Sequence, residues 1–232
     1  MNRVCLIVLL LGGAVQLSAQ TVVQQFAAVS AGAGTVSDMD LIQPTADGSV
    51  LLAMPEQLTP GIKVESVTDN APDGGNKYQK VTAAASSCAN RSIEIWYCEK
   101  CKGGVTELKF HLSGHVRASI NGFMEVAGVA LSDVLDGSGV QVSDATVGKD
   151  GQQVGPKITT KATDFVIGRY SSTSRPSAVS LPGWTFKSTY VYGSNLPPGT
   201  YQPTLTGGKT GGSFCMSMAA FKAGAADAKP QN

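Results

Sequence analysis

Short apolar segments with a period of two recur along the chain from residue 21, separated by Gly, Pro, Asn and Asp. Alternation of this kind predicts β-strands, and the residues between the segments favour turns. No window after residue 19 has a convincing helical period, so the pattern argues against a parallel α/β fold. It predicts strands near residues 21–29, 49–54, 62–68, 77–84, 91–98, 105–112, 116–127, 157–161, 164–170, 184–192 and 212–222.

So many short strands predict an all-β protein, built as a two-sheet antiparallel sandwich of the jelly-roll, lectin-like type. Removing residues 1–19 from the 232-residue chain leaves 213 residues, enough for one large core. We therefore expect a single domain over residues 20–222. The small and polar residues 223–232 predict a disordered tail.

The first nineteen residues have the layout of a secretory signal peptide. Arg3 provides a positive start, residues 4–15 are apolar, and Ala19 follows a short polar step. The apolar run is too short to span a bilayer, which needs about 20 apolar residues. We expect cleavage after Ala19 and export of a protein that begins at Gln20, to the periplasm, the cell surface or the medium.

The charge balance argues against a nucleic-acid partner. The chain has 18 Lys and Arg residues, of which Arg3 leaves with the signal peptide, and 17 Asp and Glu residues. The mature protein is then neutral, whereas nucleic-acid binding depends on neutralising phosphates with clustered cations. Low charge with 27 glycines is typical of a turn-rich extracellular β protein.

Four cysteines remain after residue 19, an even number that suits an oxidising compartment. Two disulfides are the leading interpretation, with a four-cysteine zinc site or free thiols as the alternatives. A strand, not a helix, accompanies the C-x-x-C at Cys98 and Cys101, which disfavours a redox motif. Cys88 and Cys98 lie at opposite ends of a predicted strand, so we expect Cys98–Cys101 and Cys88–Cys215 pairs.

Residues 91–112 read as a β-hairpin that places a tryptophan on a polar face. Alternation puts Ile93, Ile95 and Tyr97 in the core with Leu108 and Phe110. The opposite face would then carry four residues of a candidate ligand site: Trp96, Glu94, Lys109 and His111. Exposed aromatic rings bind sugars through their apolar faces. Trp184 is a second aromatic candidate, for which core burial is the preferred interpretation.

Other constellations favour plain structural roles. His111 and His115 flank Gly114 in a strand context, so they lack the helical spacing of a metal site. Asp69 with Asp73, and Asp133 with Asp136, could bind calcium, but the same residues also suit turns. Glu94 and Glu107 share a predicted face with Lys109, as a solvated surface would. We therefore expect no catalytic residue, metal or cofactor.

Four stretches resemble a loosely defined group of secreted bacterial β-sandwich domains. They are Val67–Asp69 with Gly75–Tyr78, Ile95–Tyr97 with Gly103 and Gly104, Glu125–Val129, and Asp164–Gly168 before Gly183 and Trp184. The resemblance covers about residues 45–222 and implies a jelly-roll or lectin-like fold without catalytic residues. The chain departs from the pattern in the Ala71–Asp73 insertion and in its cysteines.

These observations predict an exported, non-catalytic binding or adhesion module, with an extracellular glycan or a cell-surface component as partner. The second interpretation is a structural surface domain without a small ligand. The third is a glycan-directed hydrolase, which would need two facing carboxylates in a cleft.

Overall fold

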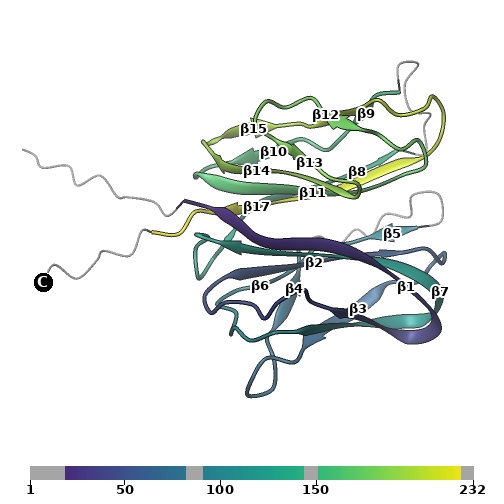
Figure 1. Cartoon of the computed structure of the whole chain (residues 1–232). Helices are drawn as coiled ribbons and strands as arrows, with labels where there is room; N and C mark the ends of the chain where they lie inside the picture. The colour runs from purple at the N-terminus through teal and green to yellow at the C-terminus, as the bar shows by residue number, and fades with distance from the viewer. Residues whose placement is uncertain (1–18, 82–90, 144–150, 226–232) are drawn as a thin grey trace, which may run out of the picture.

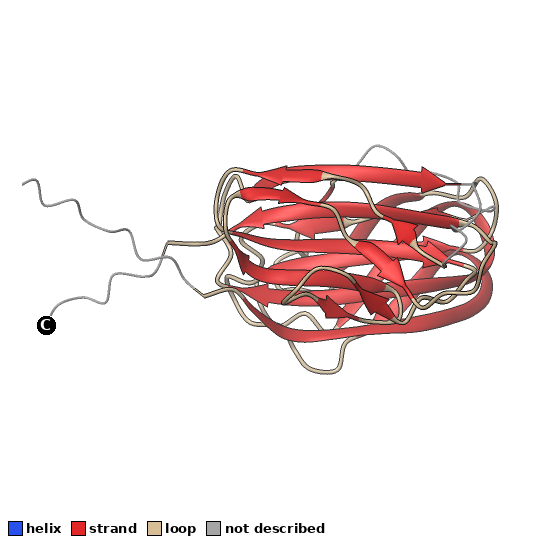
Figure 2. Cartoon of the chain, turned by 90° about the horizontal axis from the view of Figure 1, so that it is seen from above, coloured by secondary structure: helices blue, strands red, loops and turns tan. Residues whose placement is uncertain are grey.

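The computed structural model describes residues 19–81, 91–143 and 151–225, and every regular element within these residues is a strand (Figure 2). The strands are β1 (Thr21–Asp40), β2 (Val50–Gln57), β3 (Val64–Asp69), β4 (Tyr78–Lys80), β5 (Ser92–Ile93), β6 (Trp96–Cys98), β7 (Glu107–Ala127), β8 (Leu135–Ser143), β9 (Gln153–Val154), β10 (Ile158–Thr160), β11 (Asp164–Ser172), β12 (Ala178–Val179), β13 (Thr185–Phe186), β14 (Tyr190–Leu196), β15 (Gly199–Tyr201), β16 (Thr204–Thr206) and β17 (Phe214–Lys222). All pairings are antiparallel, as the sequence predicts.

A long ribbon of β1 and β7 organises the N-terminal half. These strands pair from Thr21 with Ala127 to Asp40 with Glu107, and the register shifts on either side of Gly34. One end of β7 also pairs with β2, and the other end pairs with β3. The seven-stranded sheet therefore forms two layers, one around β2 and one around β3, which the long strands β1 and β7 connect. An apolar core fills the space between them, with members such as Leu51, Val67 and Phe110.

The C-terminal half adds a five-stranded sheet in the order β13-β14-β11-β17-β8, followed by two small sheets, β10-β15 and β12-β16-β9. Figure 1 shows the five-stranded sheet between the N-terminal half and the small sheets. A second apolar core lies between the seven-stranded and five-stranded sheets, and a third lies under the small sheets. A two-sheet jelly-roll sandwich is therefore not confirmed.

The central strands are buried on both faces. Along β2, Leu51 and Ala53 enter the first core while Val50, Leu52 and Met54 enter the second. Strand β11 alternates in the same way: Phe165 and Ile167 face the second core, whereas Val166 and Tyr170 face the third. Such strands are continuous apolar runs because neither face meets water.

Every segment that alternation predicts contains an observed strand, but β1 continues to Asp40, and β8, β9, β12, β15 and β16 lie where no strand is expected. Strand β8 falls in a Gly-rich and Asp-containing segment where no strand is expected. The two strands predicted over 105–112 and 116–127 are the single strand β7. Ala223 and Gly224, which the sequence places in the tail, are paired with the domain: Ala223 bridges Val129, and the Gly224 amide donates to the Gly128 carbonyl at 2.8 Å.

The predicted 91–112 hairpin is wrong. Strand β6 pairs with β2 and β4, not with β7, because β2 lies between β6 and β7 in the sheet. Strands β6 and β7 are consecutive in the sequence, but β2, from earlier in the chain, separates them in the sheet. All five residues expected in one core are buried, but Ile95 and Tyr97 lie in the second core and Leu108 and Phe110 in the first.

The Cys98–Cys101 pair is confirmed at disulfide distance, with Cα atoms 5.8 Å apart. Cys215 is buried on β17 against Ile93, which follows Cys88 by five residues. Cys88 itself lies outside the described residues, so its pairing with Cys215 stays a prediction.

Non-reducing peptide mapping of the exported protein should yield a Cys88–Cys215 crosslink, and a Cys101–Cys215 crosslink would contradict it.

A pair of carboxyl groups, Asp136 on β8 and Asp164 at the start of β11, lies on the two strands that flank β17. Asp136 accepts hydrogen bonds from the backbone amides of Lys161 and Ala162. Burial alone would raise the pKa of Asp136, but these hydrogen bonds lower it overall. Asp164 is buried, and no donor in the described residues reaches its carboxyl oxygens. Burial, followed by its contact with Asp136, raises the pKa of Asp164 to about 7. The folded protein therefore holds a proton on Asp164 at mildly acidic pH.

This proton predicts a pH-dependent stability. The folded pKa of Asp164 lies above the ordinary value of about 4, so the folded state binds the extra proton between about pH 4 and pH 7. The free energy of unfolding should fall across this range as pH rises. Asp164→Asn, whose amide can donate to Asp136 at any pH, should flatten this dependence in urea titrations. Parallel curves for the variant and the wild type would contradict the assignment.

Candidate functional site

The predicted aromatic platform is not on the surface. Trp96 is only 7% exposed and packs in the first core, and Glu94 is 1% exposed beside it. The indole Nε1 donates to Glu94 Oε2 at 2.7 Å, and Lys80 Nζ lies 3.0 Å from the same oxygen. Alternation suggested solvent on this side of the strand, but a second layer of the seven-stranded sheet covers it. The outer-face assignment of Trp96 and Glu94 is therefore wrong.

The other two members of the predicted site, Lys109 and His111, contact residues other than Trp96. Lys109 Nζ pairs with Glu107 Oε1 at 3.3 Å, and His111 Nε2 contacts Thr68 Oγ1 at 2.9 Å. Both residues are partly exposed on β7, where it pairs with β3. Trp184 is half-buried against the third core, with its ring centroid 6.2 Å from that of Tyr201.

The acidic loops have structural partners. Asp69 accepts hydrogen bonds from the Ala71 and Asn76 amides, from the Asn76 side chain and from the Tyr78 hydroxyl. These bonds fix the turn that precedes β4. Asp133 pairs with Lys222 at 2.7 Å. Among the described residues, no group of three His, Cys, Asp or Glu side chains is placed to hold a metal ion.

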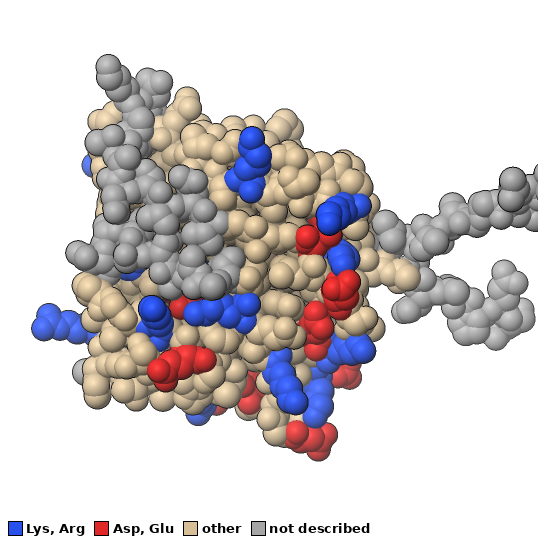
Figure 3. Space-filling view, turned by 180° about the vertical axis from the view of Figure 1, so that it is seen from behind, with Lys and Arg blue, Asp and Glu red and all other residues tan. Residues whose placement is uncertain are grey.

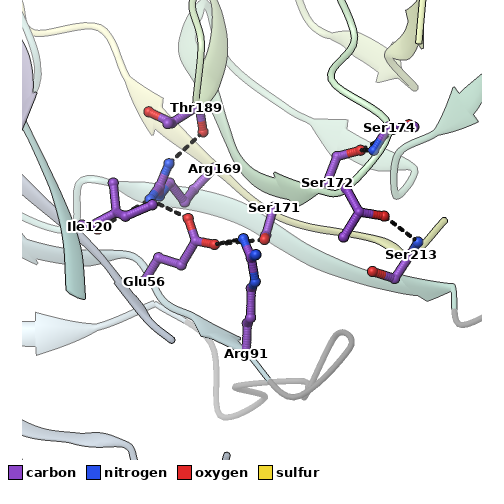
Figure 4. A network of polar contacts seen from close by, with 10 residues as sticks. Glu56, Arg91, Ile120, Arg169, Ser171, Ser172, Ser174, Thr189 and Ser213 are labelled. Carbon is purple, nitrogen blue, oxygen red and sulfur yellow. Dashed lines mark hydrogen bonds and ion pairs between the residues drawn. The ribbon is translucent and has the colours of Figure 1, made fainter. Parts of the chain in front are cut away.

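A different polar network connects the two large sheets. Glu56, at the end of β2, is 2% exposed, and Arg169 on β11 is fully buried. Arg169 Nη2 donates to Glu56 Oε2 at 2.9 Å and to the Ile120 carbonyl, and Nη1 donates to the Thr189 carbonyl (Figure 4). Burial lowers the pKa of Arg169, and Glu56 is the largest influence that opposes this shift. The two opposite charges compensate each other where both side chains are buried.

The second oxygen of Glu56 is also fully used. Its Oε1 accepts hydrogen bonds from Ser171 Oγ at 2.7 Å and from Arg91 Nη1 at 3.1 Å (Figure 4). The Arg91 side chain keeps 35% of its surface exposed. One carboxylate therefore joins an arginine in the interior to an arginine that reaches the surface.

A cavity of about 700 Å³ opens above this network, between the end of β2 and the segments that flank β11 and β13. Tyr170 and Phe186 contribute an aromatic wall, with ring centroids 6.0 Å apart in a stacked arrangement. Ile120 and Pro176 add apolar surface. The remaining lining is rich in hydroxyl groups, from Ser171, Ser172, Ser177, Ser188 and Thr189.

The polar groups of the cavity include a single carboxylate among the described residues. Glu56 is the one carboxylate among the described residues that line it, and two arginines and a serine hold it in place. Hydrolysis by paired carboxylates needs a second acid across the cleft. An apolar wall with a few convergent polar groups is the usual composition of a small-molecule site.

No sequence motif identifies this site, but the positions of two charged residues indicate it. Glu56 ends the apolar run of β2, and Arg169 interrupts the apolar run of β11. A charged residue inside a doubly buried strand requires a partner of opposite charge. The sequence indicates that Glu56 and Arg169 each need a partner of opposite charge, but only the stacking of the sheets shows that they are partners.

No known protein family, curated protein or solved structure matches the chain. In residues 19–81, 91–143 and 151–225 there is no helix with the length and apolar character to cross a membrane. On the face shown in Figure 3, acidic and basic side chains are interspersed. The site therefore has to be interpreted from its own geometry.

Trp96→Phe tests the structural role of the predicted platform. The variant keeps an aromatic ring in the first core but removes the donor to Glu94, which stays buried beside Lys80. We expect a loss of about 1–3 kcal/mol in the free energy of unfolding, measured in urea. Trp184→Phe, at a half-buried ring, is the matched control and should cost less. Equal effects of the two substitutions would contradict the assignment.

Proposed function

We propose that the protein is an exported, non-catalytic binding module whose ligand occupies the cavity above Glu56. The observation that carries this proposal is the cavity itself: about 700 Å³, with a stacked aromatic wall and a fixed polar network beneath it. Binding sites that are formed before the ligand arrives avoid the cost of ordering side chains. The hydrogen bonds around Glu56 provide such a pre-formed surface.

A carbohydrate suits this lining. Sugar rings present apolar C–H faces, which pack on aromatic side chains such as Phe186, and hydroxyls, which bond to serine and threonine side chains. Export is supported by the arrangement of residues 1–19. A glycan or a cell-surface component is therefore the proposed partner.

The experiment is a glycan-binding screen of the exported full-length product, with a variant that fills the cavity. Ser188 is exposed and lines the cavity, so Ser188→Trp should block it without disturbing the cores. Ser66→Trp, at an exposed position on β3, is the matched control. We expect binding to be lost in Ser188→Trp and kept in Ser66→Trp.

Three results would contradict the proposal. Binding that survives in Ser188→Trp would place the ligand elsewhere, and the absence of any glycan binding would favour a structural surface domain. Turnover of a bound glycan would favour the hydrolase interpretation. Intact-mass analysis of the same preparation tests export separately, because it should show a chain that begins at Gln20.

A further inference from the structure

The cationic groups around the cavity outnumber its carboxylates. Arg91, Arg175 and Lys187 line the cavity, and Glu56 is the one acid among the described residues that do so. Arg169 lies directly behind Glu56 and already compensates its charge. The open part of the cavity therefore has a positive potential, although the mature protein as a whole is neutral.

Two of these cations have no acidic partner in residues 19–81, 91–143 and 151–225. Arg175 and Lys187 are exposed, and none of the ion pairs within the described residues includes either side chain. Arg91 donates to Glu56 through Nη1 alone, and its other guanidinium nitrogens make no hydrogen bond within the same residues. Donors that stay uncommitted at the wall of a cavity are available to a ligand.

From this arrangement we infer that the ligand is an acidic saccharide, a sugar that carries a carboxylate as uronic acids do. A guanidinium group binds a planar carboxylate through two parallel hydrogen bonds, and Lys187 adds a point charge. The ring of the same sugar would pack on Phe186, and its hydroxyls would face Ser177 and Ser188. This inference rests on the proposed function, because it specifies the ligand of the same cavity.

The charge requirement separates this ligand from a neutral glycan and from a simple anion. A neutral sugar would use the aromatic wall but leave Arg175 and Lys187 without a partner of opposite charge. An inorganic anion would pair with the cations but leave Phe186 and the serine hydroxyls unused. An acidic saccharide engages both parts of the lining, so it should bind more tightly than either.

The test is isothermal titration calorimetry of the exported protein with three probes. They are a galacturonic acid trimer, a galactose trimer of the same linkage as the neutral match, and inorganic sulfate. We expect the galacturonic acid trimer to bind at least about tenfold more tightly than the other two. Raising the salt from about 0.05 M to about 0.5 M should weaken that binding, because the cations are exposed.

Substitutions at the two unpaired cations locate the effect. Arg175→Gln and Lys187→Gln should each weaken trimer binding by about tenfold, whereas Lys187→Arg should retain it. Lys77→Gln removes the same charge at an exposed position that does not line the cavity, and should change nothing. All of these side chains are exposed, so folding should be unaffected.

Each alternative result has a distinct meaning. Equal binding of the two trimers, with Ser188→Trp blocking both, would overturn the acidic saccharide and leave the proposed function intact. Sulfate binding as tight as that of the acidic trimer would also overturn it, in favour of a simple anion site. An acidic trimer that binds equally well to Ser188→Trp would overturn both proposals. Binding of neither trimer would overturn the inference, and the glycan screen would then decide the proposed function.

Discussion

The buried ion pair between Glu56 and Arg169 is the interaction on which the arrangement of the two large sheets depends. The pair joins β2 of the seven-stranded sheet to β11 of the five-stranded sheet, at the edge of the apolar core that they share. An unpaired charge at either buried position would be strongly unfavourable. Apolar packing would tolerate small shifts between the sheets, but the salt bridge needs one relative position.

The same pair makes the cavity possible. Because Arg169 neutralises Glu56 from inside, the second oxygen of Glu56 is free to hold Ser171 and Arg91 at the cavity floor. Arg169 also donates to the carbonyls of Ile120 and Thr189, which belong to the two sides of the cavity. Structure and proposed function therefore share one network, and a change in one should affect the other.

Much of the fold could be predicted from local patterns, because strand periodicity and turn residues are local properties. The number of layers also has a local signal, which a two-sheet interpretation leaves unused. The runs Val50–Met54 and Phe214–Phe221 are apolar at nearly every position, which indicates strands buried on both faces and hence more than two layers. The alternation around Trp96 suits a sheet with one solvent-exposed face, and it therefore does not predict the burial of Trp96. The partner strand of β6 comes from earlier in the chain, and local sequence carries no information about that insertion.

The candidate site was beyond prediction for a related reason. Glu56 and Arg169 are 113 residues apart, and several other acids and bases offered equally plausible partners. Glu56 ends one apolar run and Arg169 interrupts another, which indicates that both are buried. Only the three-dimensional structure shows that they meet, and that Arg175 and Lys187 line the cavity nearby.

A double-mutant cycle on Glu56 and Arg169 tests this account most directly. Glu56→Gln, Arg169→Met and the double variant would be compared with the wild type by urea unfolding. Each single substitution should cost about 3–5 kcal/mol, because it leaves the other charge buried without its partner. The double variant should cost at least about 2 kcal/mol less than the sum of the two single effects. Effects that add to within about 0.5 kcal/mol would show that the pair does not hold the sheets together.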